Sequence, residues 1–182
     1  MSSSDILSDI QAHGVDIKSR EIFLHGYVAN ADEDPGVDYK MASTFYKNIR
    51  VLDSISNDPI IIHMHSVGGN WNDGMAIYDA ILMSKCYVTI IAYGQAESMS
   101  SIIFQAADRR LMTPNTYFMS HYGSSAAVGE YLTVQNLAKY EKHICDVMID
   151  IYAQSCVGGK FFKEKYGQNP DLEKVKTYLT RK

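Results

Sequence analysis

The sequence has few cysteines and no long apolar run. Cys86, Cys145 and Cys156 are odd in number and widely spaced, without a Cys-x-x-Cys pair, so they indicate neither a disulfide framework nor a zinc knuckle. No apolar stretch approaches the roughly 20 residues that a membrane helix needs. Residues 1–5 also lack the basic and apolar regions of a signal peptide. We therefore expect a reduced, cytoplasmic protein with no membrane partner, whose cysteines are buried small hydrophobic residues.

An excess of positive charge is absent as well. The formal net charge is −4 over 182 residues, which gives no electrostatic reason to expect a nucleic acid as partner. Hydrophobic residues make up 46% of the chain and charged residues 21%, a balance typical of a globular protein with one sizeable core.

Apolar patterns in the first two thirds alternate between strand-like and helix-like stretches. This order predicts an α/β fold with a mostly parallel sheet and crossover helices. Gly94 is expected to close the third strand. The strands are expected at residues 21–28, 59–64, 87–93, 109–112 and 117–121, and the helices near 5–12, 41–52, 73–84 and 98–107.

The last third of the chain has a different pattern. Residues 129–155 contain no proline and no internal glycine, and apolar side chains recur along them at helical spacing. They predict a long amphipathic helix of about 25 residues, roughly 38 Å in length, which is expected to project and to bury its apolar stripe against a partner chain. Gly158 and Gly159 should end this helix, and a short helix is expected at 171–181.

Three separated pieces supply the groups that acyl transfer needs. Ser98 follows Gly94 at an expected strand-to-helix turn, Gly68 and Gly69 form a corner after a buried strand, and His121 ends a later strand. Together they offer a hydroxyl nucleophile, backbone N–H groups for an oxyanion and a base. Each piece also has a purely structural interpretation: a helix N-cap for the serine, a tight turn for the glycines, and a hydrogen-bonded structural histidine.

A metal site is a competing interpretation. His63 and His65 lie two residues apart on an expected strand, so both point to one face and could bind a divalent cation. No third ligand stands at a suitable spacing. We therefore expect neither a metal nor another cofactor.

Longer motifs surround the three pieces. His65-Ser66-Val67-Gly68-Gly69 matches an Asn-Ser-Pro-Gly-Gly corner, with valine where proline is usual. Gly94-Gln95-Ala96-Glu97-Ser98-Met99-Ser100 matches Gly-Gln-Ala-Ala-Ser-Met-Gly, with a glutamate where alanine is usual. Pro114-Asn115-Thr116 precedes His121 at a matching distance. In this order, over about residues 20–155, the chain resembles ClpP, the proteolytic subunit of the Clp protease, and its phage-encoded relatives.

The resemblance implies a fold, a reaction and an assembly. The fold would be a ClpP/crotonase-like βαβ spiral with a long handle helix. Ser98 would be the nucleophile and His121 the base of a serine endopeptidase, with the N–H groups of Gly68 and Met99 as the oxyanion hole. The substrate would be unfolded polypeptide, cleaved inside heptameric or tetradecameric rings of this chain, which a Clp-family unfoldase ATPase could feed.

The resemblance also implies four segments: an N-terminal arm at 1–20, an α/β head with the active site at 21–123, the handle region at 124–157, and an apparently truncated C-terminal segment at 158–182. Tyr178 falls about where the triad aspartate should be, and Asp171 is offset by about two helical turns. The third triad member is therefore unknown, and we expect it beyond Lys182 if it exists.

Two other functions stay open on the sequence alone. One is a non-catalytic ClpP-like ring component, or a phage assembly or maturation factor. The other is a crotonase-type acyl-CoA enzyme, because that fold also uses paired backbone N–H donors.

Overall fold

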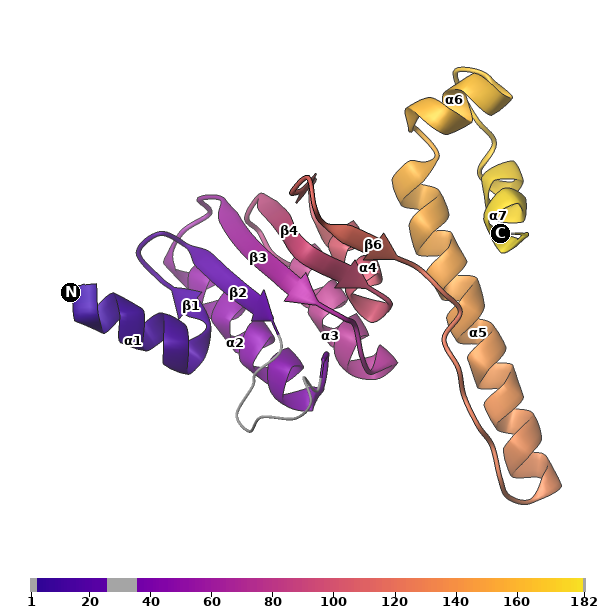
Figure 1. Ribbon diagram of the computed structural model, residues 1–182, viewed down its shortest axis with the longest axis horizontal. Helices are drawn as coiled ribbons and strands as arrows, with labels where there is room; N and C mark the ends of the chain where they lie inside the picture. The colour runs from indigo at the N-terminus through magenta and orange to yellow at the C-terminus, as the bar shows by residue number, and fades with distance from the viewer. Residues whose placement is uncertain (1–2, 26–35, 182) are drawn as a thin grey trace. The chain divides into compact units, whose positions relative to one another are not determined.

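The computed structural model describes residues 3–25 and 36–181, and the chain divides into two compact units, residues 1–121 and 122–182. In the described part of the first unit, one six-stranded sheet has the order β1-β2-β3-β4, and both β5 and β6 pair with β4 (Figure 1). β1 is antiparallel to β2, and the other pairs are parallel. This arrangement confirms the predicted α/β fold with a mostly parallel sheet. The strands are β1 (Val15–Asp16), β2 (Glu21–His25), β3 (Ile60–Ser66), β4 (Val88–Glu97), β5 (Arg109–Met112) and β6 (Tyr117–Met119).

Helices α2 (Tyr39–Ile55), α3 (Trp71–Leu82) and α4 (Met99–Ile103) lie on one face of this sheet, and α1 (Ser3–His13) contacts β1 at its edge (Figure 1). A 3-10 turn, η1 (Phe104–Ala106), extends α4. Strand side chains that point toward the helices are buried, whereas their neighbours on the opposite face are not, as the period of two requires. The buried strand residues are Ile22, Leu24, Ile60, Ile62, Met64, Val88, Ile90 and Ala92.

β4 continues past Gly94, so the prediction that this glycine closes the strand was wrong. The register pairs Met64 with Ala92 and then Ser66 with Ala96. β3 therefore advances from 64 to 66, by two residues, while β4 advances from 92 to 96, by four. A bulge takes up the difference. Gly94 has φ +60, a left-handed conformation that glycine adopts without steric cost.

The bulge also marks the point where β4 changes its neighbour. Residues 89–92 pair with β5, and residues 95–97 pair with β6. The strand consequently ends at Glu97, immediately before Ser98. The predicted strand at 21–28 is described only as far as His25, because residues 26–28 lie outside the described part of the chain.

The second unit is helical in its described part. α5 (Tyr131–Cys156) has 26 residues, about 39 Å at the usual rise per residue, and it confirms the predicted long helix. α6 (Lys160–Tyr166) was not predicted, whereas α7 (Leu172–Thr180) was. A small core joins the three helices through Ala153, Phe162 and Val175. Across the residues described, no helix combines the length and the apolarity that crossing a bilayer requires.

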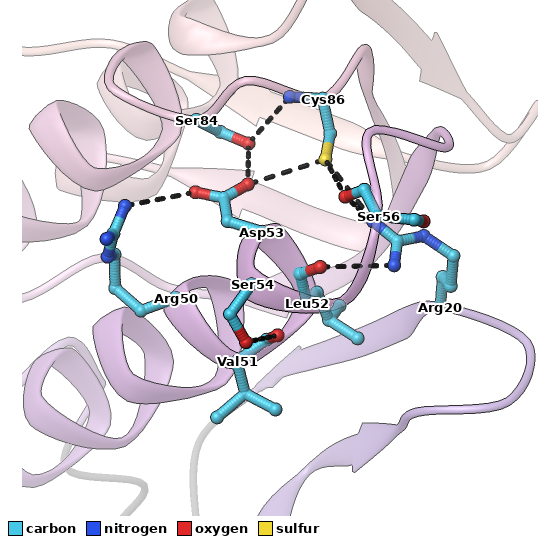
Figure 2. A network of polar contacts seen from close by, with 9 residues as sticks. All are labelled: Arg20, Arg50, Val51, Leu52, Asp53, Ser54, Ser56, Ser84 and Cys86. Carbon is cyan, nitrogen blue, oxygen red and sulfur yellow. Dashed lines mark hydrogen bonds and ion pairs between the residues drawn. The ribbon is translucent and has the colours of Figure 1, made fainter.

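A buried polar network holds the amino ends of the parallel strands together (Figure 2). Arg20, just before β2, is only 9% exposed and has φ +60. Its guanidinium donates hydrogen bonds to the carbonyls of Leu52 at 3.2 Å, Ser56 at 3.4 Å and Asp58 at 2.9 Å. One side chain thus satisfies several carbonyls at the end of α2 and in the loop that leads to β3.

Asp53 and Cys86 extend this network toward β4. The Asp53 carboxylate accepts a hydrogen bond of 2.6 Å from the Ser84 hydroxyl and one of 3.4 Å from the Cys86 thiol. Burial, and then the hydrogen bond to Asp53, raises the pKa of the Cys86 thiol. The thiol therefore stays protonated near neutral pH and acts as a hydrogen-bond donor rather than as a nucleophile.

Replacing Arg20 by alanine should destabilise the fold strongly, since it removes the hydrogen bonds of one guanidinium to the carbonyls of Leu52, Ser56, Asp58 and Pro59. We expect the free energy of unfolding to fall by about 3 kcal/mol or more, because a hydrogen bond from a charged group contributes about 1.5–3 kcal/mol. Arg110→Ala is the matched control: the Arg110 guanidinium also donates to backbone carbonyls, those of Gln105 and Ala107 at 3.2 Å, but this arginine is exposed, so a loss of about 1 kcal/mol is expected. Urea unfolding measures both, and equal losses would contradict a special role for Arg20.

Candidate active site

Ser98 occupies the sharp turn between β4 and α4. Its backbone has φ 49 and ψ −124, a region that residues with a Cβ adopt rarely and at a cost of about 1–3 kcal/mol. Its N–H donates a 2.8 Å hydrogen bond to the carbonyl of Met119 at the end of β6. A strained strand-to-helix turn of this kind presents a side chain above the sheet, as the nucleophile elbow of serine hydrolases does.

The Ser98 hydroxyl contacts an imidazole instead of the helix that it precedes. It makes no capping hydrogen bond to α4, and its Oγ lies 2.8 Å from Nε2 of His121. His121 is exposed and stands two residues after β6. For Nε2 to accept the hydroxyl proton, the ring must carry its own proton on Nδ1. Within the described residues of the first unit, no carboxylate is hydrogen-bonded to His121.

The Gly68 corner packs directly against this turn. A Cβ added to Gly68, which has φ +95, would lie 2.6 Å from Cβ of Ser98 and 2.8 Å from the backbone nitrogen of Met99. Only a glycine allows the backbone to approach so closely. On the other side, the Gly68 carbonyl accepts a 2.6 Å hydrogen bond from the N–H of Val37. The structure therefore brings Gly68, Met99 and Ser98 together.

Two buried serines beside the site received no role in the sequence analysis. Ser66 is 1% exposed and Ser100 is 0% exposed. The Ser100 hydroxyl donates to Oγ of Ser66 at 2.7 Å, and the same oxygen accepts the N–H of Gly68 at 3.3 Å. Their position inside the two matched motifs was a signal for them, but nothing in the sequence shows that the two hydroxyls meet.

The imidazole of His63 contacts aromatic rings, a hydroxyl and a carboxylate. Its ring stacks on Phe23 with centroids 4.8 Å apart and lies 5.7 Å from the ring of Tyr93. Its Nδ1 is 3.0 Å from the Tyr93 hydroxyl, and its Nε2 is 3.6 Å from Glu21. Among residues 3–25 and 36–181, no group of three His, Cys, Asp or Glu side chains could hold a metal ion. His63 is thus part of an aromatic cluster on the sheet.

Tyr178 and Asp171, the positions discussed for a third triad member, both have structural partners in the second unit. The ring centroid of Tyr178 lies 5.5 Å from those of Phe161 and Phe162, and the Lys165 ammonium stands 5.2 Å from it. The Asp171 carboxylate caps α7, accepting two backbone N–H groups at 2.8 and 3.3 Å. The third member stays unassigned.

A comparison with known protein families matches residues 12–160 to the family described as Clp protease. The chain is 31% identical over 157 residues to the ATP-dependent Clp protease proteolytic subunit 2 of Pseudomonas aeruginosa, covering 85% of this chain and 69% of that one. It is 30% identical over 137 residues to the ATP-dependent Clp protease proteolytic subunit of Carsonella ruddii, covering 74% and 66%. The chain thus spans about two thirds of the length of these relatives.

The fold has a similar counterpart among solved structures. A point mutant of ClpP1 from Listeria monocytogenes superposes with a TM-score of 0.68 over 88% of this chain and 79% of that one, at 23% sequence identity. At this identity the likeness establishes the fold, including the parallel sheet and the long helix.

Proposed function

Because the chain belongs to the Clp protease family, and is thereby a serine endopeptidase of the ClpP type, we propose that Ser98 is its nucleophile and His121 its base. The predicted family, fold class and enzyme class are confirmed by the family match, the relatives and the similar structure. The assignment of residues rests on one observation above the others. The strained turn holds the Ser98 hydroxyl 2.8 Å from Nε2 of His121.

The first half of the proposed reaction forms an acyl-enzyme. Nε2 of His121 removes the proton from the Ser98 hydroxyl while Oγ attacks the scissile carbonyl carbon. The carbonyl π electrons move to oxygen, which becomes the oxyanion. The tetrahedral intermediate collapses when the C–N bond breaks and His121 delivers its proton to the leaving amine.

In the second half of the reaction, water attacks the ester in the same way, with His121 again as base, and this releases the carboxylate product and free Ser98.

In both halves of the reaction, the N–H groups of Gly68 and Met99 would bind the oxyanion. Donors fixed in advance stabilise developing charge without reorganisation, and removing one such donor in a serine protease costs about 10²- to 10³-fold in rate. The close approach of the Gly68 corner to Ser98 and to the backbone nitrogen of Met99 supports this role.

An extended, unfolded polypeptide is the proposed substrate. The site lies at the carboxyl ends of parallel strands, and His121 and Val67 beside it are exposed. A substrate strand there could pair through its main chain with the edge at Gly68 and Gly69, which requires no particular side chains. We propose the cytoplasm as its compartment, in keeping with three free cysteines.

Proteins of this family form oligomeric rings and work with Clp ATPases. For this chain we propose rings of seven, stacked in pairs, with residues 124–157 as the handle that joins them and a Clp-family unfoldase as the ATPase. The first turns of α5 carry exposed large apolar side chains: Tyr131 is 73% exposed and Leu132 68%. Such residues are expected to be covered by a partner.

The assembly is tested by size-exclusion chromatography with light scattering on the chain as it stands. We expect a mass that is a multiple of seven subunits, and replacement of Tyr131 and Leu132 together by serine should lower it. Phe161→Ser, which changes an exposed aromatic residue outside the handle region, is the control. A stable monomer at micromolar concentration would contradict the proposed handle.

Ser98→Ala should abolish labelling by a fluorophosphonate probe, because this reagent phosphonylates only an activated serine oxygen. Ser54→Ala is the control: its hydroxyl donates to the carbonyl of Val51 within α2, and its loss should leave labelling unchanged. His121→Gln should reduce labelling at least 10²-fold, as expected for loss of a general base. In-gel fluorescence of equal protein amounts measures all three, and undiminished labelling of Ser98→Ala would refute the assignment.

A further inference from the structure

A buried hydroxyl pair links the nucleophile's helix to the glycine corner. Ser66 is the last residue of β3, and Ser100 lies in the first turn of α4, 34 residues further along the chain. Their oxygens are 2.7 Å apart, and neither side chain is more than 1% exposed. Burying two hydroxyls is unfavourable unless they are hydrogen-bonded. The contact is therefore specific, and it occurs next to the atoms proposed to react.

The Ser66 hydroxyl also forms a hydrogen bond with the backbone. Its Oγ accepts the N–H of Gly68, two residues ahead, at 3.3 Å, which closes a serine turn around Val67. Because Ser100 donates to the same oxygen, the position of the acceptor is fixed from α4. A displacement of the Ser100 hydroxyl would consequently move the Ser66 oxygen that accepts the Gly68 N–H.

The orientation of this amide is not determined by glycine itself. Gly68 has φ +95, and a residue without a Cβ moves between backbone conformations at little steric cost. The peptide group after Gly68 is held by the N–H of Val37, which donates to the Gly68 carbonyl at 2.6 Å. The peptide group before it is held by Ser66. The corner is thus restrained on both sides of its most flexible residue.

We propose that Ser66 and Ser100 act as a pair of positioning residues that hold the Gly68 N–H in the direction needed to stabilise the oxyanion at Ser98. The inference rests on the proposed function. A length of 3.3 Å is long for an N–H···O hydrogen bond, so this amide keeps the capacity to bond a second acceptor. The developing oxyanion is charged and makes the stronger bond, while the neutral Ser66 oxygen maintains the direction of the N–H.

The pair also explains two departures from the matched motifs. Those motifs have proline at the position of Val67 and glycine at that of Ser100. A proline ring fixes φ of the corner, and valine gives no such restraint. In this chain the Ser100 hydroxyl restrains the corner through Ser66 instead.

The variants Ser66→Ala, Ser100→Ala and the double variant test the proposal on a fluorogenic peptide. Each single change should lower kcat roughly 10-fold and leave KM unchanged, because the oxyanion exists only in the transition state. This is less than the 10²- to 10³-fold cost of removing a donor altogether. Since the two hydroxyls act as one unit, the double variant should be no slower than either single variant.

Two further variants separate positioning from stability. Ser84→Ala removes a hydroxyl from the Arg20 network at the opposite end of the strands; it should lower the melting temperature but not kcat. Val67→Pro added to Ser100→Ala should recover most of the lost kcat. An unchanged kcat in Ser100→Ala, or a double variant whose losses multiply, would overturn the proposal even if Ser98 is confirmed as the nucleophile.

Hydrogen exchange provides a readout that does not need activity. In the Ser98→Ala protein, the Gly68 amide should exchange roughly 5-fold faster after Ser66→Ala or Ser100→Ala, as expected when a single protecting hydrogen bond is lost or weakened, and at its original rate after Ser84→Ala. Unchanged exchange in both serine variants would refute the positioning role. A wild-type chain with a protected Gly68 amide but no acylation of Ser98 would instead count against the proposed function alone.

Discussion

The interrupted pairing of β3 with β4 is the constraint on which the site depends. Up to Ala92 the two strands pair in regular parallel register. Across the bulge at Gly94, β4 advances by four residues while β3 advances by two, and pairing resumes between Ser66 and Ala96. The bulge lets β4 leave β5 and pair with β6, whose end binds the N–H of Ser98. Without it, the serine would lie two residues out of step with the Gly68 corner and with the histidine that follows β6. One local irregularity therefore aligns three segments that are far apart in the sequence.

The amino ends and the carboxyl ends of the parallel strands have different structural roles. Their amino ends are fixed by Arg20, whose guanidinium donates to carbonyls at the end of α2 and in the loop before β3, and by the protonated thiol of Cys86. Their carboxyl ends carry strain at Ser98 and several glycines with left-handed backbones. Strained residues persist only where the surrounding structure holds them firmly. The rigid network at one end therefore stabilises a fold that can hold the strained geometry at the other.

Much of this could be predicted from the sequence, because the apolar runs of β3 and β4 and the long helix α5 are local patterns. The bulge at Gly94 could not, since it arises from pairing with two different neighbours. α6 was missed because seven residues rich in lysine show no apolar periodicity, and the helix depends on Phe162 entering a core made by distant segments. The order of the motifs predicted that Ser98 and its histidine would meet. The contact between Ser66 and Ser100 is non-local and is visible only in three dimensions.

In the proposed reaction, Ser98 attacks a carbonyl carbon and two backbone amides bind the carbonyl oxygen. A crystal structure of the chain with a peptide boronate tests it most directly, because a boronate forms a tetrahedral adduct with an activated serine and places an oxygen where the oxyanion would be. We expect a bond from boron to Oγ of Ser98, with one boronate oxygen about 2.7–3.1 Å from the nitrogens of both Gly68 and Met99. An adduct on another residue, or an oxygen directed into solvent away from both amides, would contradict it.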